Sequence, residues 1–259
     1  MSRFSHLEFG QKRRAEDDSP SGEAIRDEQF FRRRAEEAWL AGDFEKALQL
    51  HSRALEQQAT FYEGWFGQVR MLIELGEYQE AILWTDKALE LFPEHAELLA
   101  AKAIAWASDG DLQKAQAYSD NAVARKDPSS YVWLARARVL LKRKSRIAET
   151  CIRTAIGQAG PVVPIMRFEA GRLLMQNRRY AQAMEHLAEA ASQLGGAALV
   201  WYEYGRCQAH LGLPGAATAF EQCLQLRPKW QEAAKALRRF RKRGILGRLR
   251  GFIKRALGH

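Results

Sequence analysis

Residues 65–93, WFGQVRMLIELGEYQEAILWTDKALELFP, carry the pattern that decides the fold. Their central segment GEYQEAI (76–82) is related to GDFEKAL (42–48) and to GDLQKAQ (110–116), each 34 residues away. At intervals of 34 residues, a small side chain recurs at one position of each unit. In most units a large apolar side chain lies four residues before it. The small positions are Ala35, Val69, Ala103, Ala137, Gly171 and Gly205, and the large ones are Phe31, Trp65, Leu99, Trp133 and Trp201. A fixed period of this length predicts stacked units, since one unit is too small to bury its own apolar face.

Each unit has the features of two helices joined by a tight turn. The glycine of the related segments suits a helix end, because glycine tolerates a positive φ. An alanine follows in the second helix, at Ala47, Ala81 and Ala115. Prolines that stop the second helix are Pro93, Pro128, Pro161 and Pro228.

This pattern resembles the tetratricopeptide repeat, a helix–turn–helix unit of 34 residues. The resemblance covers about residues 28–229 as six units, placed at about 28–61, 62–95, 96–129, 130–162, 163–197 and 198–229. It implies an all-α, right-handed superhelical solenoid. Repeats four and five depart from the pattern, since Lys144 and Arg178 replace the turn glycine. The least regular joint is expected near GQAGPVVP (157–164).

Two flanking regions and a tail complete the expected organisation. Residues 230–243 place Trp230, Ala233, Leu237 and Phe240 at helical spacing, which predicts a helix that caps repeat six. Residues 1–27 mix basic and acidic runs without a period, which predicts a disordered arm. Residues 244–259 form a basic tail.

The charge of the chain is concentrated at its C-terminus. The net charge is +9, and the ten basic residues after Glu232 leave 30 of the 40 basic residues and all 31 acidic ones in 1–232. The body is therefore close to neutral, and the tail is the part suited to a polyanion. No apolar run approaches the roughly 18–20 residues that span a bilayer. Three cysteines without metal-ligand spacing argue against a disulfide framework and favour a reducing, cytoplasmic location.

The tail sequence ILGRLRGFIKRAL (245–257) separates into an apolar and a basic helical face. The apolar face holds Ile245, Leu246, Leu249, Phe252, Ile253 and Leu257, and the basic face holds Arg248, Arg250, Lys254 and Arg255. This combination is typical of a helix that lies in the interface of an anionic membrane. Three alternatives stay open: docking onto the solenoid as a further cap, binding in a partner's groove, and, least favoured, contact with nucleic acid.

The resemblance implies a concave groove lined by the first helix of each repeat, where partner peptides bind. Positions five and nine of a unit lie one helical turn apart and share a face. They place an arginine column in the groove, with apolar side chains beside it. The candidate partner-binding residues are Phe66, Arg70, Leu134, Arg138, Phe168, Arg172, Tyr202 and Arg206. Guanidinium groups on a rigid wall suit carboxylates, so an acidic or C-terminal peptide is expected. In the alternative, the column is a solvated face, with Glu169 and Glu203 pairing Arg172 and Arg206 within their helices.

Other sites are not indicated by the sequence. Chaperone-adaptor members of the family hold a terminal carboxylate with Lys, Asn and Asn at set positions, where this chain has Arg32, Glu36 and Gly67. A carboxylate clamp of the Hsp70/Hsp90 type is therefore not expected. The six histidines are scattered, and no nucleophile, phosphate-loop or metal motif occurs. We expect no catalytic residues, no metal and no cofactor.

The expected function is that of a non-catalytic scaffold or adaptor that binds a partner protein or peptide in its groove, with the tail attached peripherally to a membrane. The alternative is a soluble assembly factor or chaperone-like protein whose tail is an extra cap. The N-terminal SRFSHLEFG (2–10) could serve as a short docking motif or fold back into the groove.

Overall fold

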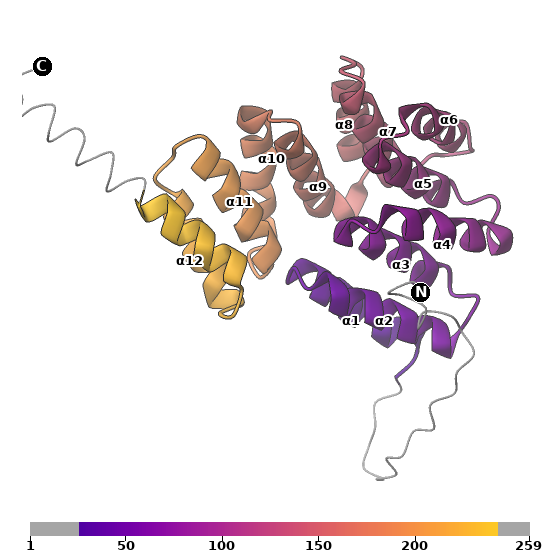
Figure 1. Cartoon of the computed structure of the whole chain (residues 1–259), viewed down its shortest axis with the longest axis horizontal. Coiled ribbons are helices and arrows are strands. Elements are labelled where there is room, and N and C mark those ends of the chain that lie inside the picture. Colours follow the sequence, from indigo (N-terminus) through magenta and orange to yellow (C-terminus); the bar gives the residue numbers. More distant parts are fainter. Residues whose placement is uncertain (1–25, 243–259) are drawn as a thin grey trace, which may run out of the picture. The chain divides into compact units, whose positions relative to one another are not determined.

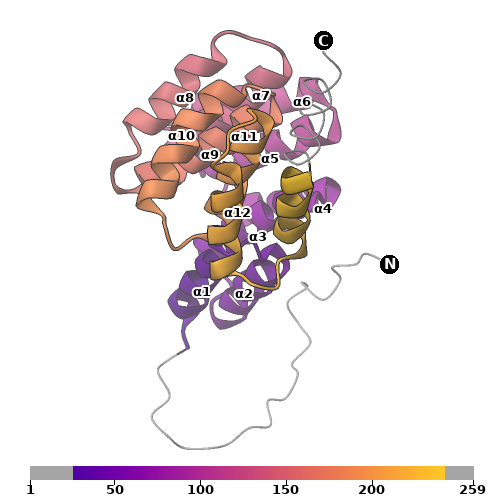
Figure 2. The same cartoon turned by 90° about the vertical axis from the view of Figure 1, so that its left-hand side faces the viewer.

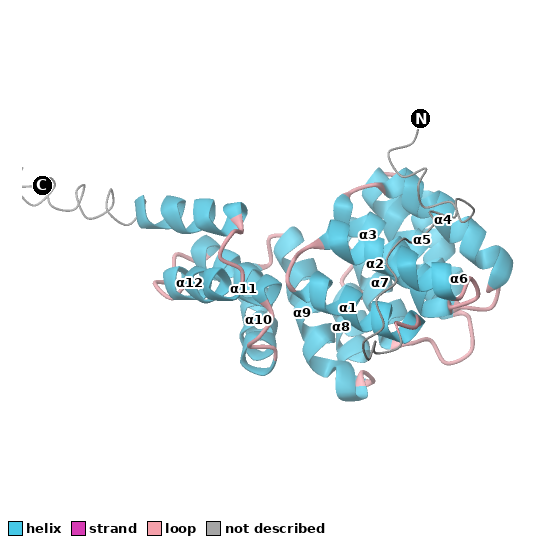
Figure 3. Cartoon of the chain, turned by 90° about the horizontal axis from the view of Figure 1, so that it is seen from below, coloured by secondary structure: helices cyan, strands magenta, loops and turns pink. Residues whose placement is uncertain are grey.

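The computed structural model describes residues 26–242 (Figure 1). All regular secondary structure in this range is helical (Figure 3). Residues 1–25 of the predicted N-terminal arm and the tail residues 244–259 lie outside the described residues. The chain divides into two compact units. Among the described residues, the first contains 26–39 and 43–125, and the second contains 126–242 with the short segment 40–42.

The first unit holds the first three helical pairs. Its helices are α1 (Glu28–Leu40), α2 (Phe44–Gln57), α3 (Tyr62–Leu75), α4 (Tyr78–Leu91), α5 (Ala96–Asp109) and α6 (Leu112–Val123). From α2 to α6 each helix packs against the next, and α3 also contacts α5. Small side chains at the repeating positions are fully buried, as Ala81, Ala103 and Ala115 show. Helix axes can approach closely only where such side chains face each other.

The second unit contains the remaining repeats and a terminal helical stretch (Figure 2). Its helices are α7 (Ser130–Lys142), α8 (Ala148–Gly157), α9 (Val163–Gln176), α10 (Tyr180–Gln193), α11 (Ala198–His210) and α12 (Ala216–Leu226), with a 3₁₀ turn η2 (Gly160–Val162) before α9. The first helices of these pairs are neighbours, since α9 contacts both α7 and α11.

Glycine at the small-residue position of α9 and α11 lets the second helix of each pair come close. A Cβ on Gly171 would lie 2.5 Å from Cγ of Leu187 on α10. A Cβ on Gly205 would lie 2.9 Å from the ring of Phe220 on α12. Both contacts are shorter than carbon atoms tolerate, so alanine does not fit at either position.

The turn chemistry explains the recurring Gly-Asp pair. Gly110 ends α5 with φ of 109°, in the left-handed region that glycine accepts. Asp111 then caps α6, since its carboxylate accepts a hydrogen bond of 2.9 Å from the backbone N–H of Lys114. Asp43 caps α2 in the same way. Lys144 and Arg178 occupy the corresponding turns of repeats four and five, also with positive φ.

Residues 231–242 are helical and cover the end of the second unit. Ala233 and Leu237 are buried, and Leu237 belongs to an apolar cluster with Ala216 and Phe220 of α12. Tyr202 of α11 and Phe240 pack against the same cluster. The apolar face of this stretch therefore shields the last repeat from water.

Candidate functional site

A hollow of about 420 Å³ lies between α11 and helical residues 231–242. Its lining combines aromatic and cationic side chains from three elements. They are Tyr202, Arg206, Ala209 and His210 of α11, Phe220 of α12, and Glu232, Lys235, Ala236, Arg239 and Phe240. Trp230, just before residues 231–242, lies 4.7 Å from Tyr202 near the start of α11, and both helices line the hollow as far as Arg239 and His210, so the two run in the same direction.

Aromatic rings build the apolar part of this hollow. The Tyr202 ring lies 4.7 Å from the Trp230 ring and 6.1 Å from the Phe220 ring, measured between centroids. Burial raises the pKa of the Tyr202 hydroxyl above its ordinary value of 10, with nearby Arg206 opposing the shift. Tyr202 is therefore neutral at physiological pH and can donate a hydrogen bond.

Cationic side chains make up most of the polar lining of this hollow. The Arg206 side chain is 43% exposed and lies 5.7 Å from the centre of the Tyr202 ring. Lys235 and Arg239 are exposed and form no ion pair with any residue of the described range. Against these three cations stands one lining carboxylate, Glu232. The hollow therefore favours an anionic ligand that also carries apolar groups.

A buried carboxylate below the hollow orients two of the predicted arginines. Glu203 lies 3.0 Å from Nη1 of Arg206 and 3.7 Å from Nε of Arg172, which belongs to the preceding repeat. Both Glu203 and Arg172 are largely buried, with exposed fractions of 8% and 11%. Pairing of Arg206 within its helix agrees with the expectation for Glu203, whereas the cross-repeat contact was not foreseen. Arg172 therefore holds the carboxylate that positions Arg206.

Two predicted apolar groove residues are buried, which corrects their expected role. Leu134 is 5% exposed and Phe168 is completely buried. Position five therefore packs into the interior in repeats four and five, and neither side chain is presented to a partner. Arg138 is half-buried and forms no ion pair with any residue in 26–242.

In the first unit, the predicted residues Phe66 and Arg70 lie together on α3. The Arg70 guanidinium lies 4.9 Å from the centre of the Trp39 ring and 5.7 Å from that of Phe66. Both side chains are half-buried. This is a stacked cation–π arrangement within the first unit. The ten candidate residues of the tail, from Ile245 to Leu257, lie outside the described residues.

The half of the hollow that residues 231–242 provide was not predicted from the sequence. The 34-residue period could have predicted it, because the residues 34 positions after Tyr202 and Arg206 are Ala236 and Phe240. Both of these residues line the hollow. The terminal helix therefore continues the row of first helices and completes the site.

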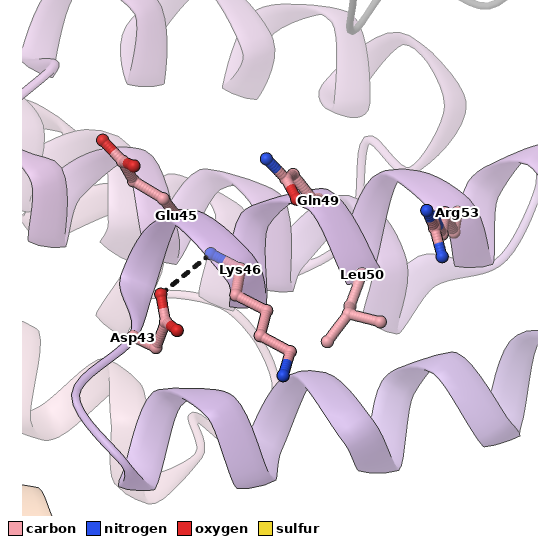
Figure 4. A pocket seen from close by; sticks show the side chains of 6 residues that line it. All are labelled: Asp43, Glu45, Lys46, Gln49, Leu50 and Arg53. Atoms are coloured by element: carbon pink, nitrogen blue, oxygen red, sulfur yellow. Dashed lines mark hydrogen bonds between the residues drawn. The ribbon is translucent and has the colours of Figure 1, made fainter. Parts of the chain in front are cut away.

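A second hollow, of about 400 Å³, lies along α2 (Figure 4). Its lining side chains are Asp43, Glu45, Lys46, Gln49, Leu50 and Arg53. Their charges balance, and the Asp43 carboxylate accepts the capping hydrogen bond from the Lys46 backbone N–H. This hollow offers a ligand no excess of either charge.

Metal-binding and membrane-spanning features are both missing from residues 26–242. No group of three or more His, Cys, Asp or Glu side chains there could hold a metal ion. In the same range, every helix is too short or too polar to cross a bilayer.

The comparisons with known proteins agree on the fold. In sequence, the chain is 25% identical over 157 residues to the Protein CTR9 homolog of Arabidopsis thaliana, a match that spans 58% of this chain and 14% of that protein. In structure, it is similar to TTC0263, a thermophilic TPR protein of Thermus thermophilus, with a TM-score of 0.53, 19% identity, and coverage of 70% of this chain and 98% of that one.

It is also similar to a chain of the APC/C hetero-tetramer Cut9–Hcn1, with a TM-score of 0.52 and 16% identity, covering 83% of this chain and 43% of that one. At these identities the structural likeness concerns the fold alone. That fold is in general a non-catalytic scaffold for protein–protein interaction. The Tetratricopeptide repeat family matches residues 38–105, 134–198 and 168–229, and the chain belongs to this family.

Proposed function

We propose that this chain is a non-catalytic adaptor that binds an acidic peptide segment of a partner protein in the hollow between α11 and residues 231–242. The observation that carries the proposal is the excess of cations, Arg206, Lys235 and Arg239, over the single lining carboxylate Glu232. The aromatic floor suits apolar side chains of the same peptide.

Preorganisation supports this assignment. Glu203 holds the Arg206 guanidinium by two contacts, of 3.0 and 3.2 Å to its carboxylate oxygens. A fixed arginine loses less side-chain entropy when a carboxylate binds than a free one does. The alternative, a soluble assembly factor with a chaperone-like role, would use the same hollow and differ in its partner.

Reversing two charges of the hollow is expected to weaken peptide binding at least tenfold. The variant is Lys235→Glu with Arg239→Glu, because both side chains are exposed and neither supports the core. Each close charge pair lost at a binding site costs roughly 1 kcal/mol or more. The probe is a fluorescein-labelled peptide of alternating Glu and Leu with a free C-terminal carboxylate, followed by fluorescence anisotropy.

The matched control is Arg153→Glu with Lys229→Glu, which changes the net charge equally at exposed positions outside the hollow. This control should bind the peptide as the unmodified chain does. A peptide with Lys in place of Glu should not bind. Equal affinity of the two charge-reversed variants would contradict the proposed site.

We also propose that the basic C-terminal region attaches the adaptor peripherally to the cytoplasmic face of an anionic membrane. The described part of this region supports the idea, since Lys235, Arg238, Arg239, Arg241 and Lys242 are all exposed. Each basic residue near such a surface contributes about 1 kcal/mol. The amphipathic pattern of residues 245–257 adds an apolar face.

The tail should account for most of the membrane affinity. We expect the full chain to sediment with phosphatidylglycerol vesicles and not with phosphatidylcholine vesicles, and 0.5 M salt to weaken this binding through screening. A full-length variant with Leu249→Asp and Ile253→Asp should bind at least tenfold more weakly. Attachment by the tail would be excluded if binding were the same for both lipids and for the chain with and without these substitutions.

A further inference from the structure

The first helices of the second unit end along one edge of that unit. Helices α7, α9 and α11 are neighbours, and residues 231–242 start beside Tyr202 and run in the same direction as α11. A hollow of about 640 Å³ is lined by Arg146, Arg178 and Leu211, which belong to the turns that follow α7, α9 and α11. Arg179 and Glu149 form an ion pair of 2.5 Å across two of these turns. We call this row of turns, residues 142–149, 176–182 and 210–215, the turn edge.

The turn edge is strongly basic. Its exposed cations are Lys142, Arg143, Lys144, Arg146 and Arg178, and none of them forms an ion pair with another residue in 26–242. Arg179 neutralises Glu149, the carboxylate that lines the hollow. The unit as a whole therefore presents an unbalanced positive field at this edge.

Two of these cations occupy a backbone conformation that favours glycine. Lys144 has φ of 56° and Arg178 has φ of 59°. The turns of the other four repeats place glycine there, with φ between 71° and 109° at Gly42, Gly76, Gly110 and Gly212. A side chain with a Cβ is disfavoured in this region. Backbone strain of this kind is concentrated at functional sites, and here it places a positive charge at the tip of each turn.

Exposed apolar side chains lie among the cations. Ile147 is 63% exposed, Leu211 38% and Leu213 37%, and all three belong to the turn edge. Isolated exposed apolar residues need no explanation, but a group rimmed by cations is the composition of a surface that enters lipid headgroups. Nucleic acid would match the charge and would gain nothing from Ile147 or Leu213.

The turn edge continues into the C-terminal region. Because residues 231–242 run in the same direction as α11, their C-terminal half reaches the end of α11, where Arg239 lines the same hollow as His210. The basic amphipathic sequence 244–259 continues from that point. Residues 231–242 therefore add the exposed cation Arg239 to the same edge.

We infer that the turn edge of the second unit lies on an anionic phospholipid surface, with Lys144 and Arg178 on the headgroups and Ile147 and Leu213 between them. The inference rests on the proposed attachment by the tail and adds the face that the protein turns to the lipid.

The test removes charge and strain together. In the full chain, Lys144→Gly with Arg178→Gly should lower the affinity for phosphatidylglycerol vesicles by about tenfold or more, since each cation near the surface contributes to binding. The melting temperature should stay the same or rise, because glycine accepts the positive φ. A loss of affinity could then not be attributed to unfolding.

The matched control is Lys126→Gln with Lys229→Gln, which removes the same net charge from exposed positions in the loops at the opposite ends of the helices. This variant should keep at least half of the vesicle affinity. If both double variants lose affinity equally, only net charge matters and the inference is overturned. If the glycine variant binds vesicles normally while L249D/I253D does not, the tail attachment stands and the turn edge has no part in it.

A depth-sensitive label provides a second readout. The natural cysteines are buried, and burial raises the pKa of Cys207 to about 11 and that of Cys223 to about 12, so an introduced exposed cysteine reacts selectively. An NBD label at Ile147→Cys or Leu213→Cys should shift its emission to the blue on vesicles. The same label at Leu226→Cys should show no blue shift. Leu226 is exposed and lies at the C-terminal end of α12, about 16 Å from the start of that helix.

Two further outcomes would overturn the inference. One is an equal spectral shift at Leu226 and Ile147, which would mean that no single face meets the lipid. The other is a glycine variant that binds vesicles normally and loses affinity for a 20-base-pair DNA or RNA duplex. That result would assign the turn edge to nucleic acid.

Discussion

Replacing Gly67 by alanine is expected to lower the free energy of unfolding of the first unit by about 3 kcal/mol, since overpacking a filled interior costs up to that amount or more. Gly67 on α3 faces the imidazole of His51 on α2. A Cβ at Gly67 would lie 2.1 Å from Cε1 and 2.4 Å from both nitrogens of that ring. His51 is 6% exposed, so the ring has no room to turn away.

Urea unfolding followed by circular dichroism, with hydrogen exchange read at α2 and α3, measures this loss. The control is Gly157→Ala, where no atom lies within 4 Å of the added Cβ and φ is not positive. The control should change stability by less than about 0.5 kcal/mol. In the double variant Gly67→Ala with His51→Ala, the two costs should be strongly less than additive, because removing the ring makes room for the methyl group. Additive costs would show that the contact is not the cause.

Acidification is expected to destabilise the first unit through His51. Burial, with smaller contributions from Arg70 and Arg32, lowers the pKa of His51 from 6.5 to about 3. Above pH 6.5 the imidazole is neutral in both the folded and the unfolded chain, so it has no effect. Between pH 6.5 and 3 the unfolded chain binds a proton that the folded chain does not, and stability is lost as the pH falls.

The slope is about 1.4 kcal/mol per pH unit, or about 3 kcal/mol between pH 6.5 and 4.5. The measurement compares urea unfolding of the unmodified chain and of His51→Gln across this range. Both proteins share the contribution of paired carboxylates, so the difference between their slopes belongs to His51. Parallel stability curves for the two proteins would show that His51 titrates normally in the folded state.

The repeat architecture could be predicted because its information is local. A period of 34, a small residue at each helix crossing and a glycine at the turn lie within one unit, and a unit contacts chiefly its neighbours. Family membership and the all-α solenoid are confirmed on this basis. Even the terminal helical stretch follows the period, through Ala236 and Phe240.

The candidate site could be predicted only in part, because burial and pairing depend on neighbouring repeats. Position five carries Phe168, which is completely buried, and Tyr202, which lines a hollow, although the pattern treats them alike. Glu203 was expected to pair within its helix, and the fold also brings it to Arg172 of the repeat before.

A buried lysine of the first unit gives a further example. The buried Lys102 on α5 forms an ion pair with the half-exposed Asp86 of α4 and donates a hydrogen bond of 2.9 Å to the hydroxyl of Tyr118 on α6. The sequence offered no reason for a lysine there. The reason lies in two side chains, each 16 residues away, that supply its acceptors.

The sequence by itself therefore determined the repeat, the helices and their turns, since these follow from contacts within about 34 residues. The tertiary structure decided which side chains of a repeated position stay accessible, which carboxylate holds Arg206, and that Arg146 and Arg178 of different turns line one hollow. The physical reason is that each of these depends on atoms supplied by another repeat, whose identity the period of the pattern does not contain.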